Sequence, residues 1–185
     1  MSDDEKRRWT PPKDAREKAD ASGRTLAKRE KVRKKTLGKS SRDWVDRQLN
    51  DPYVRRAQEA GYRARAAYKL LEIDEKFGVL KKGARVLDLG CAPGGWAQVV
   101  MHKGAIALAG VDLLPVDPIE GATIYMGDIA EAGMIDKLLK AIGGKPTLVL
   151  SDMAANTIGH AQTDHIRTVG LAEFAAHIAV DHLEK

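Results

Sequence analysis

Four aspartates follow the apolar runs in the second half of the chain, each where a predicted strand ends. They are Asp88, Asp112, Asp128 and Asp152. Because aspartate is a poor strand former and is costly to bury, four acids in these positions indicate a binding site. In an open parallel sheet the ligand lies across the carboxyl ends of the strands, so we expect these side chains to face a nucleoside-type ligand.

A glycine-rich loop joins the first of these acids to a predicted helix. Its sequence is Asp88-Leu89-Gly90-Cys91-Ala92-Pro93-Gly94-Gly95-Trp96. Backbone N–H groups at such a strand-to-helix turn can face a ligand, and Gly94 and Gly95 allow a close approach. Trp96 is expected to pack on the ligand or to cap the helix start, with an ordinary packing role as the alternative.

Two ligands, NAD and S-adenosylmethionine, are the alternatives for this loop, and they differ in charge. The dinucleotide fingerprint arranges its glycines around a pyrophosphate, whereas here Pro93 interrupts the glycines and Asp88 adds a negative charge. Asp112 follows Asp88 by 24 residues, a spacing typical of an acid that binds ribose hydroxyls. Asp128 is placed to accept a hydrogen bond from an adenine amino group. The sequence therefore favours S-adenosylmethionine, which is cationic and has no phosphate.

The elements that must position these residues alternate along the chain. Strands are predicted over Ala84–Leu89, Ile106–Val111, Thr123–Met126 and Thr147–Leu150. Helices are predicted around Trp44–Leu49, over Tyr53–Ala60, over Ala66–Ile73 with an end near Gly78, from about Trp96, over Met134–Ile142 and from about Thr163. This order predicts an α/β fold with a mostly parallel sheet and helices on both faces. The sequence ends inside the last predicted helix, so we expect the final strands of the domain to be missing.

Charge is divided unevenly between the two halves of the chain. Residues 1–87 hold 25 lysines and arginines against 14 acids, a formal charge of +11, and residues 88–185 hold 6 against 12, a charge of −6. A basic front half predicts contact with RNA or DNA, with a solubilising tail as the alternative. Residues 1–40 contain few large apolar side chains and are predicted to be a basic, disordered tail, and residues 41–185 to form one domain.

Composition argues against several other classes of protein. The single cysteine, Cys91, excludes an internal disulfide and fits a reducing cytoplasm. No apolar run is long enough for a transmembrane helix, and no secretory signal follows the basic start. Four of the five histidines lie between residues 160 and 182 without the spacing of a metal site. We therefore expect a cytoplasmic monomer that binds no metal.

Several motifs, in order and with matched spacing, resemble those of the FtsJ/RlmE-type 2′-O-ribose methyltransferases. They are the loop Asp88–Trp96, Asp112-Leu113-Leu114-Pro115, Gly127-Asp128, Ser151-Asp152-Met153-Ala154-Ala155-Asn156 and the upstream run 63–70. The resemblance covers residues 41–185 and implies a Rossmann-like class I methyltransferase fold. It also implies methylation of a uridine ribose in large-subunit (23S) ribosomal RNA within the assembled 50S particle.

The resemblance further implies a role for each matching residue. The contacts to S-adenosylmethionine would come from Gly94, Trp96, Asp112, Asp128 and Asp152. Of the family's catalytic set Lys-Asp-Lys-Glu, Lys69 matches the first member and Asp152 the second. A lysine acts as a base only where burial or a nearby cation lowers its pKa, and carboxylates then orient it.

This sequence departs from the family pattern at a few positions. Ala64 stands where serine is common, Cys91 where a small residue such as alanine is common, and Ala155 where proline is common. The family's second lysine lies on a later strand, and Glu184 and Lys185 match neither remaining catalytic position. Two alternatives therefore stay open: an inactive fragment that binds cofactor or RNA, and a methyltransferase acting on transfer RNA or another RNA.

Overall fold

The computed structural model describes residues 51–155 and 159–184. The predicted tail over residues 1–40 and the predicted helix around Trp44–Leu49 lie outside this part of the chain. The chain divides into two compact units, residues 1–68 and residues 69–185. The domain boundary predicted between residues 40 and 41 stays a prediction.

The described part of the first unit contains a helix and a group of tyrosines. Helix α2 (Pro52–Glu59) begins after Asp51, whose carboxylate accepts a hydrogen bond of 2.8 Å from the Tyr53 N–H. This is the usual N-cap role of aspartate, which satisfies one of the backbone donors that a helix start leaves unpaired. The Tyr68 ring lies 5.8 Å from that of Tyr53 and 6.0 Å from that of Tyr62. The three tyrosine rings therefore pack together in the described part of this unit.

The second unit is built on a parallel sheet of four described strands in the order β3-β2-β1-β4. They are β1 (Arg85–Leu89), β2 (Ala107–Asp112), β3 (Ala122–Met126) and β4 (Leu148–Ser151). Every neighbouring pair is parallel, and each strand lies within one residue of its predicted bounds, so the α/β prediction is confirmed. Central β1 is almost wholly buried, as a strand covered on both faces must be, whereas edge strand β3 is half exposed.

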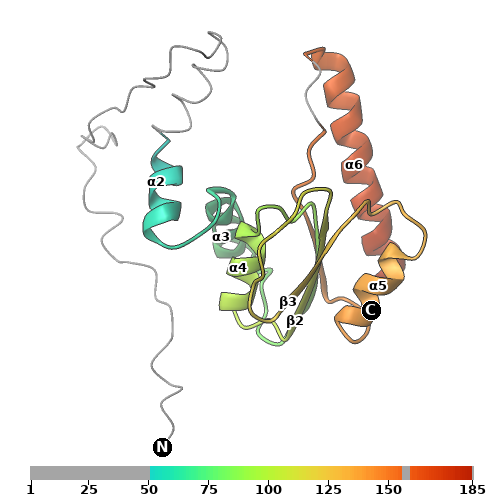
Figure 1. The fold of residues 1–185 in the computed structure, drawn as a ribbon, viewed down its shortest axis with the longest axis horizontal. Helices are drawn as coiled ribbons and strands as arrows, with labels where there is room; N and C mark the ends of the chain where they lie inside the picture. The colour runs from blue at the N-terminus through green and yellow to red at the C-terminus, as the bar shows by residue number, and fades with distance from the viewer. Residues whose placement is uncertain (1–50, 156–158, 185) are drawn as a thin grey trace, which may run out of the picture. The chain divides into compact units, whose positions relative to one another are not determined.

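Helices cover both faces of this sheet, as Figure 1 shows. Helix α4 (Gly95–His102) packs on one face against β1 and β2, and α5 (Met134–Ala141) and α6 (Ala161–His182) pack on the other. Helix α3 (Ala66–Phe77) precedes β1 in the chain. These helices were all predicted; α3 and α5 begin at the predicted residues, and the other bounds differ from the prediction by a few residues at most.

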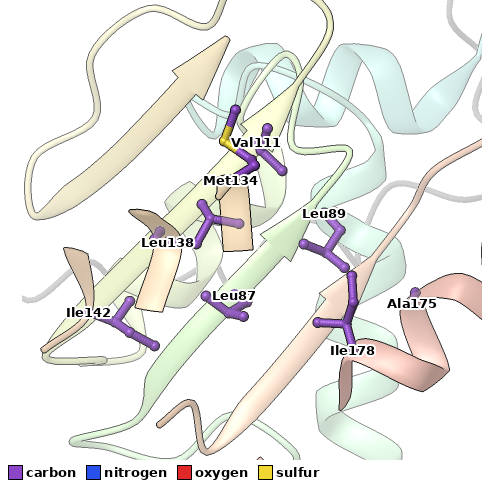
Figure 2. Packing of buried hydrophobic residues seen from close by; sticks show 9 residues of the cluster. Leu87, Leu89, Val111, Met134, Leu138, Ile142, Ala175 and Ile178 are labelled. Atoms are coloured by element: carbon purple, nitrogen blue, oxygen red, sulfur yellow. The ribbon is translucent and has the colours of Figure 1, made fainter. Parts of the chain in front are cut away.

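The core on the face covered by α5 and α6 determines which way the site residues of β1 point. Leu87 and Leu89 of β1 are fully buried there, and Figure 2 shows them with residues of β2, α5 and α6: Val111, Met134, Leu138, Ile142, Ala175 and Ile178. Successive strand residues point to opposite faces. Asp88, between the two leucines, therefore points to the face covered by α4.

A buried carboxylate joins α3 to the end of α4. Asp74 is 8% exposed, accepts a hydrogen bond of 2.8 Å from the Leu80 N–H, and lies 2.6 Å from the Lys103 ammonium. Burial opposes its ionisation, but the hydrogen bonds from Lys103 and Leu80 and the charges of Lys103 and Lys81 outweigh burial and lower the pKa of Asp74. The folded state therefore holds this carboxylate ionised.

Replacing Asp74 by asparagine is expected to lower the free energy of unfolding at pH 7 by about 1–2 kcal/mol, because a charged hydrogen-bonded pair is lost. An acid with a lowered folded pKa stabilises the protein above its unfolded pKa, near 4, and this stability is lost as the pH falls through the folded pKa. Urea unfolding at pH 7 and pH 3 measures both effects. Glu120→Gln, at an exposed loop position, is the matched control, and equal losses in both variants would contradict the prediction.

Candidate functional site

The loop between β1 and α4 takes its shape from two glycines in the left-handed region. Gly90 has φ 80° and Gly94, at the N-cap of α4, has φ 104°, values that disfavour a side chain. The Gly90 N–H donates to the Val111 carbonyl over 2.9 Å, which fixes the loop to the end of β2. The first backbone N–H groups of α4 therefore lie at the carboxyl end of the sheet, where the sequence places the cofactor.

Asp112 supports this loop from the end of β2. One carboxylate oxygen accepts a hydrogen bond of 2.9 Å from the Ala92 N–H, and the other accepts one of 2.9 Å from the Leu114 N–H. Each carboxylate oxygen has a second lone pair, so both can still accept from ribose hydroxyls. Asp112 is half-buried and accessible. It therefore orders the loop and can also bind a ligand.

Asp128 follows β3 at the same edge of the sheet. Its carboxylate accepts a hydrogen bond of 2.9 Å from the Ala130 N–H, which forms a local turn, and its side chain is exposed. The preceding Gly127 N–H donates to the Asp112 carbonyl over 2.9 Å. The structure thus places Asp112 and Asp128 at strand ends, as the sequence predicts, and shows that the two strands are adjacent. Asp128 bonds its own local backbone, whereas Asp112 also bonds the β1–α4 loop.

Lys69 and Asp152 meet although 83 residues separate them in the chain. The Lys69 ammonium lies 2.5 Å from an Asp152 oxygen and 5.5 Å from the centre of the Trp96 ring. Asp152 follows β4, and its N–H donates to the Leu89 carbonyl over 3.3 Å. Helix α3, the β1–α4 loop and β4 therefore bring the two predicted catalytic residues together beside Trp96. Glu184 instead contacts Arg85. Arg85 is the first residue of β1, so this contact lies at the amino ends of the strands, away from the candidate site.

Trp96 is nearly buried in the first turn of α4, with 7% of its surface exposed. Gly94 occupies the N-cap position of that helix, so Trp96 does not cap it. The cation–π contact to Lys69 gives its ring a defined neighbour, worth about 0.5–1 kcal/mol where solvent reaches the cation. Trp96 therefore packs in the core and also contacts Lys69 in the candidate site.

Asp88 lies beneath the loop and is the most unusual group in the site. It is 0% exposed, and neither carboxylate oxygen has a hydrogen-bond partner among the described residues. Burial, followed by the negative charges of Asp152 and Asp112, raises the pKa of Asp88 to about 7. The sequence indicated that the negative charge of Asp88 would disfavour a phosphate-bearing ligand. It could not predict that the carboxyl lacks a hydrogen-bond partner among the described residues, because this depends on how the surrounding segments pack.

Cys91 fills the space between the loop and β2. A Cβ on Gly110 would lie 2.9 Å from its sulfur. Burial, then the charges of Asp88 and Asp112, raises the pKa of the Cys91 thiol to about 12. The thiol is therefore protonated at neutral pH and not a nucleophile, as expected of a space-filling residue.

Gly90 also allows the end of β4 to approach the loop closely. A Cβ there would lie 2.6 Å from Met153 Cγ and 3.1 Å from the backbone N and Cα of the same residue. A single sequence shows no pattern that predicts this contact, since Gly90 and Met153 are far apart in the chain. The approach sets the place of the adjoining Asp152.

Gly90→Ala is therefore expected to destabilise the fold by about 2–4 kcal/mol, from the left-handed backbone and the clash together. It should also displace Asp152 and weaken ligand binding. Gly143→Ala is the control, because Gly143 has φ 72° but a Cβ added to it would meet no atom within 4 Å. Thermal unfolding compares the two variants, and an equal loss in both would show that the Met153 contact contributes nothing.

Neither a cluster of metal-ligating side chains nor a membrane-spanning helix is present among the described residues. Residues 51–155 and 159–184 contain no group of three or more histidines, cysteines or acids arranged to hold a metal ion. None of the helices in this part of the chain is long and apolar enough to cross a membrane.

Comparison with known proteins places this arrangement in a family. The family model for FtsJ-like methyltransferases matches residues 62–185. A ribosomal RNA large subunit methyltransferase E from Hyphomonas neptunium is 53% identical over 184 residues, covering 100% of this chain and 77% of the relative. One of the same name from Sphingopyxis alaskensis is 62% identical over 145 residues, covering 78% and 63%. The chain thus spans between 63% and 77% of the length of these relatives.

A solved structure supports the same assignment. The crystal structure of a ribosomal RNA methyltransferase from Plasmodium falciparum matches with a TM-score of 0.60 and 34% identity, covering 66% of this chain and 73% of that one. The chain belongs to the FtsJ-like methyltransferase family.

Proposed function

We propose that this chain binds S-adenosylmethionine at the carboxyl ends of β1, β2 and β3 and serves the 2′-O-methylation of a uridine ribose in large-subunit ribosomal RNA. The observation that carries the proposal is the ion pair of Lys69 and Asp152, 2.5 Å apart, beside Trp96 and the glycine loop. The relatives' names supply the ribosomal substrate. We further propose that the protein acts in the cytoplasm as a monomer and uses its basic front half to contact RNA phosphates.

The residues of the site fit a cationic nucleoside better than a phosphate-bearing one. Asp88 is a buried acid without a hydrogen-bond partner among the described residues, and Asp112 and Asp152 add negative charge around it. Such a cluster attracts a cation and repels phosphate. In this proposal Gly94 and Trp96 contact the cofactor, Asp112 accepts from its ribose and Asp128 from its adenine, and Asp152 faces the methyl-bearing end.

The Lys69–Asp152 pair lies where an acceptor hydroxyl would have to be held. When bound, S-adenosylmethionine supplies an electrophilic methyl group on its sulfonium sulfur. Asp152 and the Trp96 ring both stabilise a positive charge on Lys69 Nζ. An ammonium in this position can donate a hydrogen bond to the ribose oxygen and stabilise the negative charge that develops as its proton leaves. Holding hydroxyl and methyl together supplies much of the remaining acceleration.

Lys69→Met is expected to reduce methyl transfer at least about 100-fold and to change S-adenosylmethionine affinity by less than about threefold, because only the acceptor side is altered. Transfer is measured as labelled methyl incorporated into large ribosomal subunits from cells lacking the endogenous enzyme, and affinity by calorimetry. Lys76→Met is the matched control, since Lys76 lies exposed on the same helix with its ammonium over Phe77.

Each outcome discriminates between functions. Full transfer by the Lys69 variant would remove Lys69 from the catalytic set. Cofactor binding without any transfer by the unmodified chain would favour the binding fragment over the enzyme. Incorporation into transfer RNA alone would overturn the ribosomal substrate, and a failure to bind S-adenosylmethionine would overturn the proposal as a whole.

A further inference from the structure

The buried carboxyl of Asp88 has no partner among the described residues that explains its place in the core. Most buried polar groups in proteins are hydrogen-bonded, and an acid left unpaired in the interior carries a large desolvation penalty. Asp88 is 0% exposed, and both of its oxygens lack a hydrogen-bond partner within the described ranges. It lies at the end of β1, directly beneath the loop that the cofactor is proposed to contact.

Within residues 51–155 and 159–184, the charges that shift the pKa of Asp88 are negative. From β2 it faces Asp112 and from the end of β4 Asp152, and both disfavour its ionisation. The loop contributes the Cys91 thiol, which is neutral. On α3, the Lys69 ammonium is paired with Asp152 over 2.5 Å.

We propose that Asp88 is a proton-linked element of the cofactor site, which holds a proton in the free protein and releases it to solvent when a cationic ligand occupies the carboxyl edge. The inference rests on the proposed function and adds a group that acts through charge. One O–H bond of the Asp88 carboxyl breaks, the electron pair stays on the carboxylate, and the proton goes to water. The resulting carboxylate compensates the positive charge of the ligand.

Two physical effects support this linkage. Burial and the two neighbouring acids raise the pKa of Asp88 to about 7, so near neutral pH about half of the molecules carry the proton. An opposite charge within about 4–6 Å lowers the pKa of a carboxyl by about 1–3, enough to ionise Asp88 at pH 6–7. Ligand and proton then compete, and the affinity for a cationic ligand rises with pH in this range.

The test measures protons released on binding, independently of catalysis. Calorimetry of the full chain at pH 6 and pH 7, in two buffers of different ionisation enthalpy, gives the number of protons per ligand. The probes are S-adenosylmethionine and 5′-methylthioadenosine, which shares the nucleoside but has neither the sulfonium nor the ammonium. The variants are Asp88→Asn, which cannot titrate, and Glu120→Gln as an exposed acid-to-amide control.

For S-adenosylmethionine at pH 6 we expect release of about 0.4–0.9 proton in the unmodified chain and in Glu120→Gln, and none in Asp88→Asn. Affinity should be about threefold to fivefold higher at pH 7 than at pH 6. The neutral probe 5′-methylthioadenosine should release no proton. Binding without proton release, or release that persists in Asp88→Asn, would overturn the inference and leave the proposed function standing. If the variant does not fold, the comparison of the two probes in the unmodified chain decides alone. Failure of both probes to bind would overturn the proposed function and, with it, this inference.

Discussion

S-adenosylmethionine binding is expected to fall at least about 100-fold when Asp112 is replaced by alanine. Asp112 accepts hydrogen bonds of 2.9 Å from the Ala92 N–H and the Leu114 N–H, and it is proposed to accept from the ribose hydroxyls as well. A hydrogen bond to a charged group contributes about 1.5–3 kcal/mol, and about 1.4 kcal/mol corresponds to a factor of ten. Losing the ribose contact and the order of the loop together therefore exceeds two factors of ten.

Asp112→Asn is the informative partner of this variant. The amide keeps one acceptor oxygen, so it can retain one of the two backbone hydrogen bonds but loses the charge. Its affinity should fall between those of the unmodified chain and Asp112→Ala. Calorimetry measures the affinities, and circular dichroism checks that both variants keep the fold. Unchanged affinity in the alanine variant would refute the ribose contact assigned to Asp112.

The second large effect concerns the stability of the free protein. Burial, and next the charges of Asp152 and Asp112, raises the pKa of Asp88 from 3.8 to about 7. The folded state therefore binds more protons than the unfolded state between these values, and its free energy of unfolding decreases as the pH rises. Each pKa unit corresponds to about 1.4 kcal/mol, so the loss contributed by Asp88 between pH 4 and pH 8 is up to about 4 kcal/mol.

Asp88→Asn isolates this contribution, because an amide does not titrate over this range. We expect the variant to gain stability relative to the unmodified chain as the pH is raised from 5 to 8. Any fixed penalty for burying the amide is the same at each pH and does not affect this difference. Urea unfolding of both proteins at several pH values provides the measurement. Parallel stability curves would show that Asp88 titrates alike in the folded and unfolded states.

Local patterns explain why so much of the fold was predictable. The strand that begins at Arg85 and the helix that begins at Gly95 are short segments. Their apolar residues and glycines determine the local backbone conformation over a few neighbouring positions. The order of the strands was not predicted, because it depends on the crossover connections, but the alternation of strands and helices predicted a mostly parallel sheet. Asp112 and Asp128 were predicted at strand ends on one side of the sheet because parallel strands all present their carboxyl ends on the same side; the structure shows that the two strands are adjacent.

By itself, then, the sequence determined the α/β class, the glycine loop and the line of acids, because these follow from backbone geometry and local periodicity. Only the tertiary structure decided that Lys69 meets Asp152 across 83 residues, and that Gly90 admits Met153. It alone left Asp88 without a hydrogen-bond partner among the described residues. The physical reason is that close contacts and desolvation depend on how segments distant in the chain pack against one another.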